Sequence, residues 1–389
     1  MKAAARSTAS GPALRLLHLH SSFHAGGKEL RCVQLINAFG QGASHTIVSA
    51  EPDALDAGAL IAKGIAVRFP GDFPALAGRP TPARLQRLAK AMQGHDLILT
   101  YNWGAMDAVM AHTLFADVFK LAPLVHHEDG FNADEANGLK RSRNWYRRIA
   151  LGRVSALVVP SRSLEQVARE AWQQTAGKVK RIANGIPVAR YAASKPRRDA
   201  LPRVIKQPGE KWLGTLAGLR AVKNLPRLVR AFSGLPDEWH LVIAGEGPER
   251  EAIRAEAVRL EVGHRVHLPG FVADPARALG LFDLFALSSD SEQFPLSVVE
   301  AMASGLAVAA PAVGDVAEIV AEPNRAFIPR PGDDGGLAAA IYTLALDPAL
   351  RRRVGEANRV RARDRFDEGK MVAAYARVYA AALRRPAFP

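Results

Sequence analysis

Two glutamates, Glu292 and Glu300, lie eight positions apart around a predicted helix start, in a segment whose residues could bind a sugar phosphate. The segment, 285–305, reads FALSSDSEQFPLSVVEAMASG. It begins in an apolar run, 281–287, which predicts a buried strand. A polar turn follows, and Pro295 favours the start of a helix. One carboxylate therefore lies at the strand-to-helix turn, and the second lies two turns further along.

The start of this helix is expected to bind phosphate. Backbone N–H groups near Phe294, Leu296 and Ser297 have no helical acceptor, and the helix dipole attracts negative charge there. Glu292 could accept hydrogen bonds from the hydroxyls of a sugar, and Glu300 from those of a ribose. Such a site fits a sugar joined to a nucleoside through a diphosphate. The alternative is a surface helix cap with two solvated glutamates.

The same segment resembles the signature of family four of the glycosyltransferases, which are retaining enzymes. The family pattern is a glutamate, Gly-Phe-Pro, and a second glutamate with seven residues between the two, followed by Ala-Met-Ala. Gln293 stands where glycine is usual. The resemblance implies an α/β fold called GT-B, in which two Rossmann-like, doubly wound domains face each other across a cleft. The matching residues are Glu292, Phe294, Pro295, Glu300, Ala301, Met302, Ala303 and Gly305.

Two further turns extend the resemblance to the donor phosphates. Gly26 and Gly27 follow a predicted first strand, where glycine lets a ligand approach the backbone, and they match a family element that faces these phosphates. Lys223 matches the family lysine that neutralises the donor diphosphate. Gly218 occupies the position of the family arginine, so Arg220, two residues on, is expected to replace it.

Three other positions receive roles from the same resemblance. His126 ends a predicted strand and matches the histidine that helps to position the reacting sugar; a structural histidine bonded to the backbone is the alternative. Phe271 and Val272 follow the strand 266–271, where the backbone of relatives holds the nucleobase. The run HHEDG and the turn Tyr-Asn-Trp-Gly loosely resemble a bacterial exopolysaccharide-type subgroup. The expected catalytic residues are His126, Glu292 and Lys223.

Strand and helix patterns alternate along the chain, which indicates parallel sheets with helices between the strands. We expect an acceptor-side domain, 1–193, and a nucleotide-sugar domain, 194–369. The last helix, within 370–389, is expected to pack back on the first domain. Strands are predicted at 14–20, 45–49, 66–69, 97–100, 123–126 and 156–159, and then at 212–217, 240–244, 266–271, 281–287 and 306–310.

Composition narrows the choice of partners. The 389 residues suffice for two domains, and a single cysteine, Cys32, suits a reducing, cytoplasmic compartment. The N-terminus lacks the apolar centre of a signal peptide, and no apolar run is long enough for a transmembrane helix. The formal net charge of +14 fits an anionic substrate or membrane face. No nucleic-acid-binding motif is found, so nucleic acid is not an expected partner.

A basic segment, KRSRNWYRRIALGR from Lys140 to Arg153, carries no acidic residue and contains Trp145, Tyr146 and Ile149. A helix of this composition can rest on anionic lipid, so peripheral contact with the inner membrane face is a further prediction. A solvated surface helix is the alternative.

The sequence therefore predicts a transferase that moves a hexose from a UDP-, GDP- or ADP-linked sugar to a hydroxyl of a polysaccharide or lipid-linked glycan. The resemblance implies retention of configuration. No Asp-x-Asp element lies on a suitable strand, so neither a metal at the donor nor another cofactor is expected. The alternatives are a nucleotide-sugar-binding protein without turnover, and an epimerase or phosphorylase of the same fold.

Overall fold

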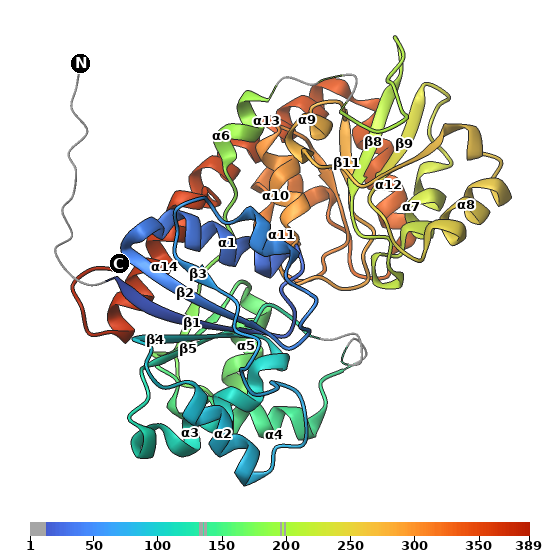
Figure 1. The fold of residues 1–389 in the computed structure, drawn as a ribbon. Coiled ribbons are helices and arrows are strands. Elements are labelled where there is room, and N and C mark those ends of the chain that lie inside the picture. The colour runs from blue at the N-terminus through green and yellow to red at the C-terminus, as the bar shows by residue number, and fades with distance from the viewer. Residues whose placement is uncertain (1–12, 132–134, 136–137, 195–196, 198–199) are drawn as a thin grey trace, which may run out of the picture. The chain divides into compact units, whose positions relative to one another are not determined.

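In a computed structural model, the chain forms two compact units, each built around a parallel sheet (Figure 1). The structure describes residues 13–131, 135, 138–194, 197 and 200–389. Unit 1 comprises the chain up to Ile182 together with Val372–Pro389, and unit 2 comprises Ala183–Met371. Both units alternate strand and helix, which confirms the predicted Rossmann-like α/β fold.

The sheet of unit 1 has the strand order β3-β2-β1-β4-β5-β6-β7, with every pair of neighbours parallel. Six of the strands lie where the sequence predicts them, and β7 was not predicted because its three residues include two charged side chains. The strands are β1 (Leu14–His20), β2 (Ala43–Ser49), β3 (Val67–Arg68), β4 (Leu97–Tyr101), β5 (Leu124–His127), β6 (Ala156–Val159) and β7 (Val179–Arg181).

Helices cover both faces of this sheet, with α1 and α14 on one face and α2, α3 and α4 on the other (Figure 1). The alternation of side chains along β1 shows how the two faces differ. Leu17 and Leu19 belong to the apolar cluster that includes α2 and α3, whereas His18 and His20 face the α1 side. The helices are α1 (Gly27–Phe39), α2 (Pro82–Ala91), α3 (Met106–Phe119), α4 (Arg141–Ala150), α5 (Arg162–Glu170) and α14 (Glu368–Ala382).

The sheet of unit 2 has the order β10-β9-β8-β11-β12 and is also parallel. The predicted strand 281–287 shortens to β11, because the backbone of Leu281 and Phe282 closes the turn after α9. The strands are β8 (Lys211–Leu216), β9 (Trp239–Ala244), β10 (Val266–Gly270), β11 (Leu284–Ala286) and β12 (Val308–Ala309).

Two apolar clusters, one on each face, form the core of unit 2. Phe285 of β11 belongs to the cluster that contains α10, and its neighbours Leu284 and Ala286 belong to the cluster that contains α7 and α12. No helix among the described residues is both long and apolar enough to span a bilayer. The helices are α6 (Val188–Ala193), α7 (Leu225–Phe232), α8 (Arg250–Arg259), α9 (Pro275–Leu279), α10 (Leu296–Ala303), α11 (Val316–Ile319), α12 (Asp334–Leu346) and α13 (Pro348–Arg365).

Candidate functional site

The loops after β8 and β11 meet where the strand order of unit 2 reverses. In open parallel sheets, ligands bind outside the carboxyl ends of the strands at such a reversal. The backbone N–H of Asp290 donates to the carbonyl of Val222 at 2.9 Å, and the Ser288 hydroxyl donates to the carbonyl of Lys223 at 2.9 Å. The two loops therefore hold each other in place at this edge of the sheet.

Lys223 and Glu292, both predicted site residues, lie in contact between these loops. Lys223 Nζ is 2.5 Å from Glu292 Oε1, and the Ser289 hydroxyl donates to the same oxygen at 2.7 Å. Both charged side chains are mostly buried but remain accessible. The structure thus brings together a cation suited to a diphosphate and a carboxylate suited to sugar hydroxyls.

The helix that follows Lys223 begins with a left-handed residue. Asn224 has φ +43°, and its side-chain amide lies 3.2 Å from the carboxylate oxygens of Asp290. Arg227, one turn into α7, forms an ion pair of 2.7 Å with the same carboxylate. The charge of Arg227 is therefore compensated by Asp290 within the site.

Glu300, the second predicted carboxylate, lies on α10 and contacts Tyr191 of α6. The Tyr191 hydroxyl donates to Glu300 Oε1 at 2.8 Å. Burial raises the pKa of the Glu300 carboxyl, and the hydrogen bond from Tyr191 partly opposes this rise. Oε2 of Glu300 has no hydrogen-bond partner in the described part of the chain, so it could accept a bond from a ligand hydroxyl.

The first turn of α10 begins at Leu296, with Pro295 as its N-cap and no side chain capping it. The N–H groups of Leu296 and Ser297 have no acceptor among the described residues, as a phosphate-binding helix start requires. Phe294 contributes differently from its neighbours, because its ring is buried edge-on against Phe366 with centroids 5.7 Å apart. Its side chain anchors the turn, so only its backbone stays a predicted contact of the phosphate.

Gly314 allows another loop to approach Glu292 closely. It has φ +54°, and a Cβ at this position would lie 2.4 Å from the carbonyl oxygen of Glu292 and 2.7 Å from that of Gln293. A side chain here would therefore displace the backbone that carries Glu292.

Arg220 and Phe271 are the exposed members of the predicted donor site. Arg220 lies two residues after Gly218, and its guanidinium folds back over this glycine, where an added Cβ would be 3.4 Å from Nε. Phe271, just beyond β10, has 69% of its surface exposed, and Val272 is half-buried. Both side chains are accessible at the carboxyl ends of their strands.

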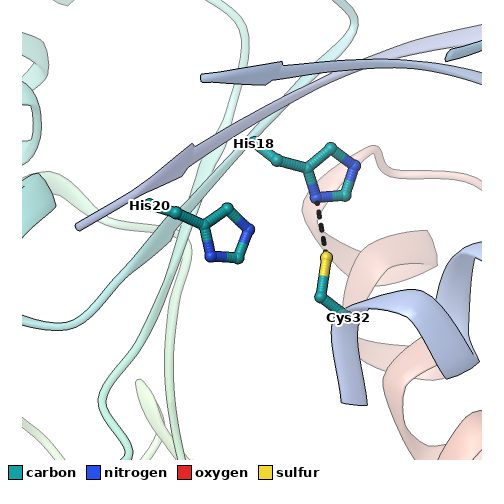
Figure 2. A group of neighbouring side chains, drawn as sticks. All are labelled: His18, His20 and Cys32. Carbon is teal, nitrogen blue, oxygen red and sulfur yellow. Dashed lines mark hydrogen bonds between the residues drawn. The ribbon is translucent and has the colours of Figure 1, made fainter. Parts of the chain in front are cut away.

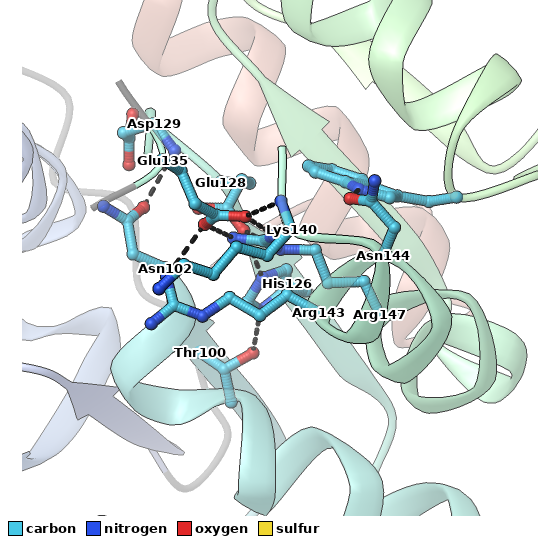
Figure 3. A network of polar contacts seen from close by, with 11 residues as sticks. Thr100, Asn102, His126, Glu128, Asp129, Glu135, Lys140, Arg143, Asn144 and Arg147 are labelled. Atoms are coloured by element: carbon cyan, nitrogen blue, oxygen red, sulfur yellow. Dashed lines mark hydrogen bonds and ion pairs between the residues drawn. The ribbon is translucent and has the colours of Figure 1, made fainter. Parts of the chain in front are cut away.

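In unit 1, His126 lies inside a buried polar network rather than at an accessible surface (Figure 3). Its Nδ1 is 2.8 Å from the Thr100 hydroxyl, and its Nε2 is 3.8 Å from Glu128 Oε2. The imidazole is fully buried, so a sugar could reach it only after the surrounding side chains moved. Its catalytic role stays a prediction.

Arg147 of α4 crosses this network and neutralises its acids. Its Nε donates to Glu128 at 3.3 Å, and its NH2 group is 3.3 Å from Glu135 Oε2. Arg143 adds a bond of 3.1 Å to Glu135. In Figure 3, Arg147 lies beside Glu128 and Glu135, and Arg143 lies beside Glu135. Two basic side chains of the segment predicted to touch a membrane therefore turn inward.

The glycine pair of unit 1 lies at the start of α1, with Gly26 as the N-cap residue. The following helix carries a buried ion pair, since Lys28 Nζ is 2.7 Å from Glu29 Oε1. Burial raises the pKa of Glu29. Gly26 lies against this carboxylate, where an added Cβ would be 2.9 Å from Oε2, so Gly26 keeps the first turn compact.

Sequence reasoning missed the residues that orient the site. In the sequence, Ser289 belongs to a polar turn, Tyr191 lies in no motif, and Arg147 lies in a segment whose composition predicts a membrane-contacting or solvated helix. Tyr191 and Arg147 have no recognisable spacing to Glu300 and Glu128, because those partners come from other elements. Ser289 lies only three residues before Glu292, but a loop gives this spacing no fixed geometry.

Two family models match consecutive parts of the chain. "Glycosyltransferase Family 4" matches residues 25–190, and "Glycosyl transferases group 1" matches residues 197–361. Together the two segments account for most of the chain.

Relatives and solved structures agree with these matches. An N-acetyl-alpha-D-glucosaminyl L-malate synthase of Bacillus anthracis is 31% identical over 45% of this chain and 46% of its own length. A glycogen synthase of Mycobacterium tuberculosis is 28% identical over 74% of this chain and 69% of its own length. Crystalline HepE of Anabaena, in complex with UDP and glucose, superposes with a TM-score of 0.76 at 22% identity, covering 95% of this chain and 100% of that chain. The chain belongs to family four of the glycosyltransferases and has the GT-B fold.

Proposed function

We propose that this chain transfers a hexose from a nucleotide diphosphate sugar to a hydroxyl of a polysaccharide or lipid-linked glycan, with retention and without a metal ion at the donor. The observation that carries the proposal is the contact between Lys223 and Glu292 at the strand-order reversal of unit 2. Membership of family four supports the reaction type, and retention rests on that membership. HepE, crystallised with UDP and glucose, makes UDP-glucose the first donor to test.

In this proposal, the donor diphosphate lies at the start of α10. The N–H groups of Leu296 and Ser297 and the ammonium of Lys223 would stabilise the charge that develops as the diphosphate departs. Such preorganised donors each contribute about 3 kcal/mol to lowering a barrier. Arg220 would supply a second cation from the same turn, in place of the arginine absent at Gly218.

The two glutamates would hold the sugars on either side of the diphosphate. Glu292 would accept hydrogen bonds from hexose hydroxyls once the diphosphate draws Lys223 away from it. Glu300 would accept a bond from the ribose through Oε2, while Tyr191 holds Oε1. The exposed ring of Phe271 and the backbone at Val272 would line the place of the nucleobase.

The first experiment is a thermal-shift screen of the purified chain against UDP, GDP and ADP and their hexose conjugates. A ligand present at a hundred times its dissociation constant stabilises the folded state by about 2.7 kcal/mol. The stabilising donor is then incubated with glycan and lipid-linked acceptors, with and without EDTA. We expect transfer that EDTA leaves unchanged.

Three outcomes would contradict the proposal in distinguishable ways. Donor binding without transfer to any acceptor would favour a binding protein. A changed sugar recovered on the same nucleotide would favour an epimerase. Loss of transfer in EDTA that Mg²⁺ or Mn²⁺ restores would contradict the metal-independent mechanism.

The outer side of the α3–α4 pair favours an acceptor at a membrane surface. The two helices run side by side in the same direction. Thr113 of α3 donates to the carbonyl of Ala150, the last residue of α4, at 2.5 Å, and further along α3 Asp117 pairs at 2.6 Å with Arg153, three residues past the end of α4. Leu114, just after Thr113 in α3, and Ile149, just before Ala150 in α4, therefore turn to one common side.

That common side carries large apolar residues that are exposed. Val118 is 71% exposed and Trp145 is 65% exposed, and Leu114 and Ile149 lie beside them on the same two helices. Arg141 and Arg148, also exposed, add positive charge to α4. Basic residues near an anionic bilayer contribute about 1 kcal/mol each. We propose that this side rests on an anionic cytoplasmic membrane face, where a lipid-linked acceptor would be presented.

A further inference from the structure

A second cluster of chemically active side chains lies in unit 1, on the sheet face covered by α1. His18 and His20 project from β1 to the same face because they are two residues apart. Cys32 reaches them from α1, and Tyr101 comes from the neighbouring strand β4. All four side chains are almost completely buried, with at most 3% of any residue exposed. None of them takes part in the proposed transfer.

The atoms of His18, Cys32 and Tyr101 are spaced as in a tetrahedral metal site, and a ring nitrogen of His20 lies near them. Cys32 Sγ is 3.5 Å from His18 Nδ1, and Tyr101 Oη is 3.2 Å from His18 Nδ1 and 3.6 Å from Cys32 Sγ. His20 belongs to the same group. One ring nitrogen of His20, one of His18 and the sulfur of Cys32 all lie within 4.8 Å of one another. Around tetrahedral zinc, with Zn–S about 2.3 Å and Zn–N about 2.0 Å, neighbouring ligand atoms are about 3.3–3.6 Å apart.

Figure 2 shows the ring of His20 beside that of His18, with Cys32 reaching from α1 toward both. Both ring nitrogens of His20 are buried and have no hydrogen-bond partner in the part of the chain that the structure describes. A buried imidazole in this state costs about 1–3 kcal/mol for each unmatched polar group. Coordination of one nitrogen to a metal would remove much of this cost.

His45 supplies the outer partner that metal-bound histidines usually have. Its Nδ1 lies 2.9 Å from His18 Nε2, the nitrogen of His18 that faces away from Cys32. If His18 donates its Nε2 proton to His45, then Nδ1 carries the free lone pair and is directed toward Cys32 and Tyr101. In this tautomer, His18 can bind a metal through Nδ1 while Nε2 bonds its outer partner.

We propose that His18, His20 and Cys32 bind one zinc ion, with the Tyr101 oxygen at the fourth position. Two imidazoles and one thiolate are ligands that zinc prefers. Binding would release the thiol proton of Cys32 to solvent, as a thiolate ligand requires. The ion would connect β1 to α1 and so fix both ends of the loop that contains Gly26 and Gly27.

Burial determines how the metal would enter. Without metal, burial raises the pKa of Cys32 to about 12, so the side chain is a neutral thiol. Because the ligands are inaccessible in the folded chain, zinc would bind during folding or local opening and would exchange slowly afterwards.

The test measures metal in the full-length chain by plasma mass spectrometry. The protein is expressed with zinc and copper both supplied, and separately unfolded and refolded with zinc or with EDTA. We expect about one zinc per chain after expression and after refolding with zinc, and a higher melting temperature than in the chain refolded with EDTA. Less than about a tenth of an equivalent in both zinc samples would overturn the proposal, and copper at one equivalent would overturn the assignment to zinc.

Two variants separate this site from adventitious binding. Cys32→Ser and His20→Phe should each lower zinc to below about a fifth of an equivalent. His112→Gln, a change at another buried histidine that bonds only the carbonyl of Ala122, should retain full occupancy. Full occupancy in both cluster variants would contradict the ligand assignment.

The absorption spectrum of a cobalt-substituted chain tests the ligands directly, and it does not depend on the stability of the variants. The wild-type chain refolded with Co²⁺ should show a thiolate-to-metal absorption band together with the visible bands of tetrahedral cobalt. X-ray absorption of the zinc form should give one sulfur and three nitrogen or oxygen neighbours. A spectrum with six oxygen or nitrogen neighbours and no sulfur would overturn the proposal.

Discussion

Lys223 and Glu292 are 69 positions apart in the chain, yet their charged groups lie 2.5 Å apart at the edge where the strand order of unit 2 reverses. The carboxylate holds the lysine at the site before any donor is present. A diphosphate carries more negative charge than one carboxylate, so it would draw the ammonium away and free Glu292 for sugar hydroxyls. In the proposed mechanism, the pair would therefore link donor binding to exposure of the acid that holds the hexose.

Replacing Lys223 with methionine should lower kcat/KM for transfer by about 100-fold or more, since loss of one preorganised donor costs about 3 kcal/mol of barrier. Lys211→Met is a matched control, because Lys211 also pairs with a glutamate, Glu238, but lies at the start of β8. Steady-state kinetics of both variants with the donor found in the thermal screen decides the matter. Equal activity in the two variants would remove Lys223 from the proposed site.

Tyr191→Phe should make donor binding more sensitive to acid. The Tyr191 hydroxyl stabilises ionised Glu300, whose pKa burial raises, so removal of the hydroxyl should raise that pKa further. In the proposed complex, ionised Glu300 accepts hydrogen bonds from both Tyr191 and the ribose. Protonation of Glu300 would weaken these bonds, so donor affinity should fall as pH decreases. In the variant this fall should begin at higher pH.

Donor titrations across the acidic range measure this shift. Tyr342→Phe, a change at a half-exposed tyrosine of α12, should leave the pH midpoint unchanged. A wild-type midpoint in Tyr191→Phe would show that Glu300 does not control donor affinity.

Gly314→Ala should weaken donor binding by displacing the backbone of Glu292. An added methyl group would lie 2.4 Å from the carbonyl oxygen of Glu292, and φ at Gly314 is +54°. Gly332→Ala has the same left-handed strain, with φ +80° and no atom within 4 Å of the added methyl group. Both changes should cost about 1 kcal/mol of stability through backbone strain. Only Gly314→Ala should raise the donor dissociation constant, which calorimetry can measure.

Arg147→Met should destabilise unit 1 strongly. The change leaves Glu128 buried without its cation, and breaking a buried ion pair from one side costs about 3–5 kcal/mol. Arg148→Met, at the next and exposed position, should change stability by less than about 0.5 kcal/mol. Urea unfolding compares the two.

The double variant Arg147→Met with Glu128→Gln tests the reason for this loss. Removing the unpaired charge should recover part of the stability, since the glutamine amide carries no charge to desolvate. If the double variant is no more stable than Arg147→Met, then lost packing around Arg147 explains the effect.

Trp145→Ser with Ile149→Ser should reduce binding to anionic vesicles by about tenfold, because both apolar side chains would leave the bilayer interface. Leu60→Ser, at another exposed apolar residue of unit 1, should have no effect. Sedimentation with phosphatidylglycerol and phosphatidylcholine vesicles measures both. Equal binding to the two lipids by the wild-type chain would contradict an anionic membrane surface.

Local spacing made the fold and much of the candidate donor site predictable. A short strand, a polar turn and a proline-led helix fix where Glu292 and Glu300 lie relative to one helix start, and 3.6 residues per turn needs no tertiary information. Strand periodicity likewise predicted both sheets. It missed β7, because charged Lys180 and Arg181 hide the pattern of an edge strand.

The tertiary structure alone decided which partners these side chains have. Basic composition suggested that the whole segment 140–153 faces solvent or lipid, but packing turned Arg147 inward to neutralise Glu128, since a buried carboxylate needs a cation nearby. The contact of Tyr191 with Glu300 likewise joins elements that are distant in sequence, and the position of His20 beside Cys32 depends on how α1 packs on the sheet. The sequence by itself determined the strands and helices, and it placed Glu292 and Glu300 around the start of one helix. Contacts across a sheet depend on how strands are ordered and helices packed, and no local spacing encodes them.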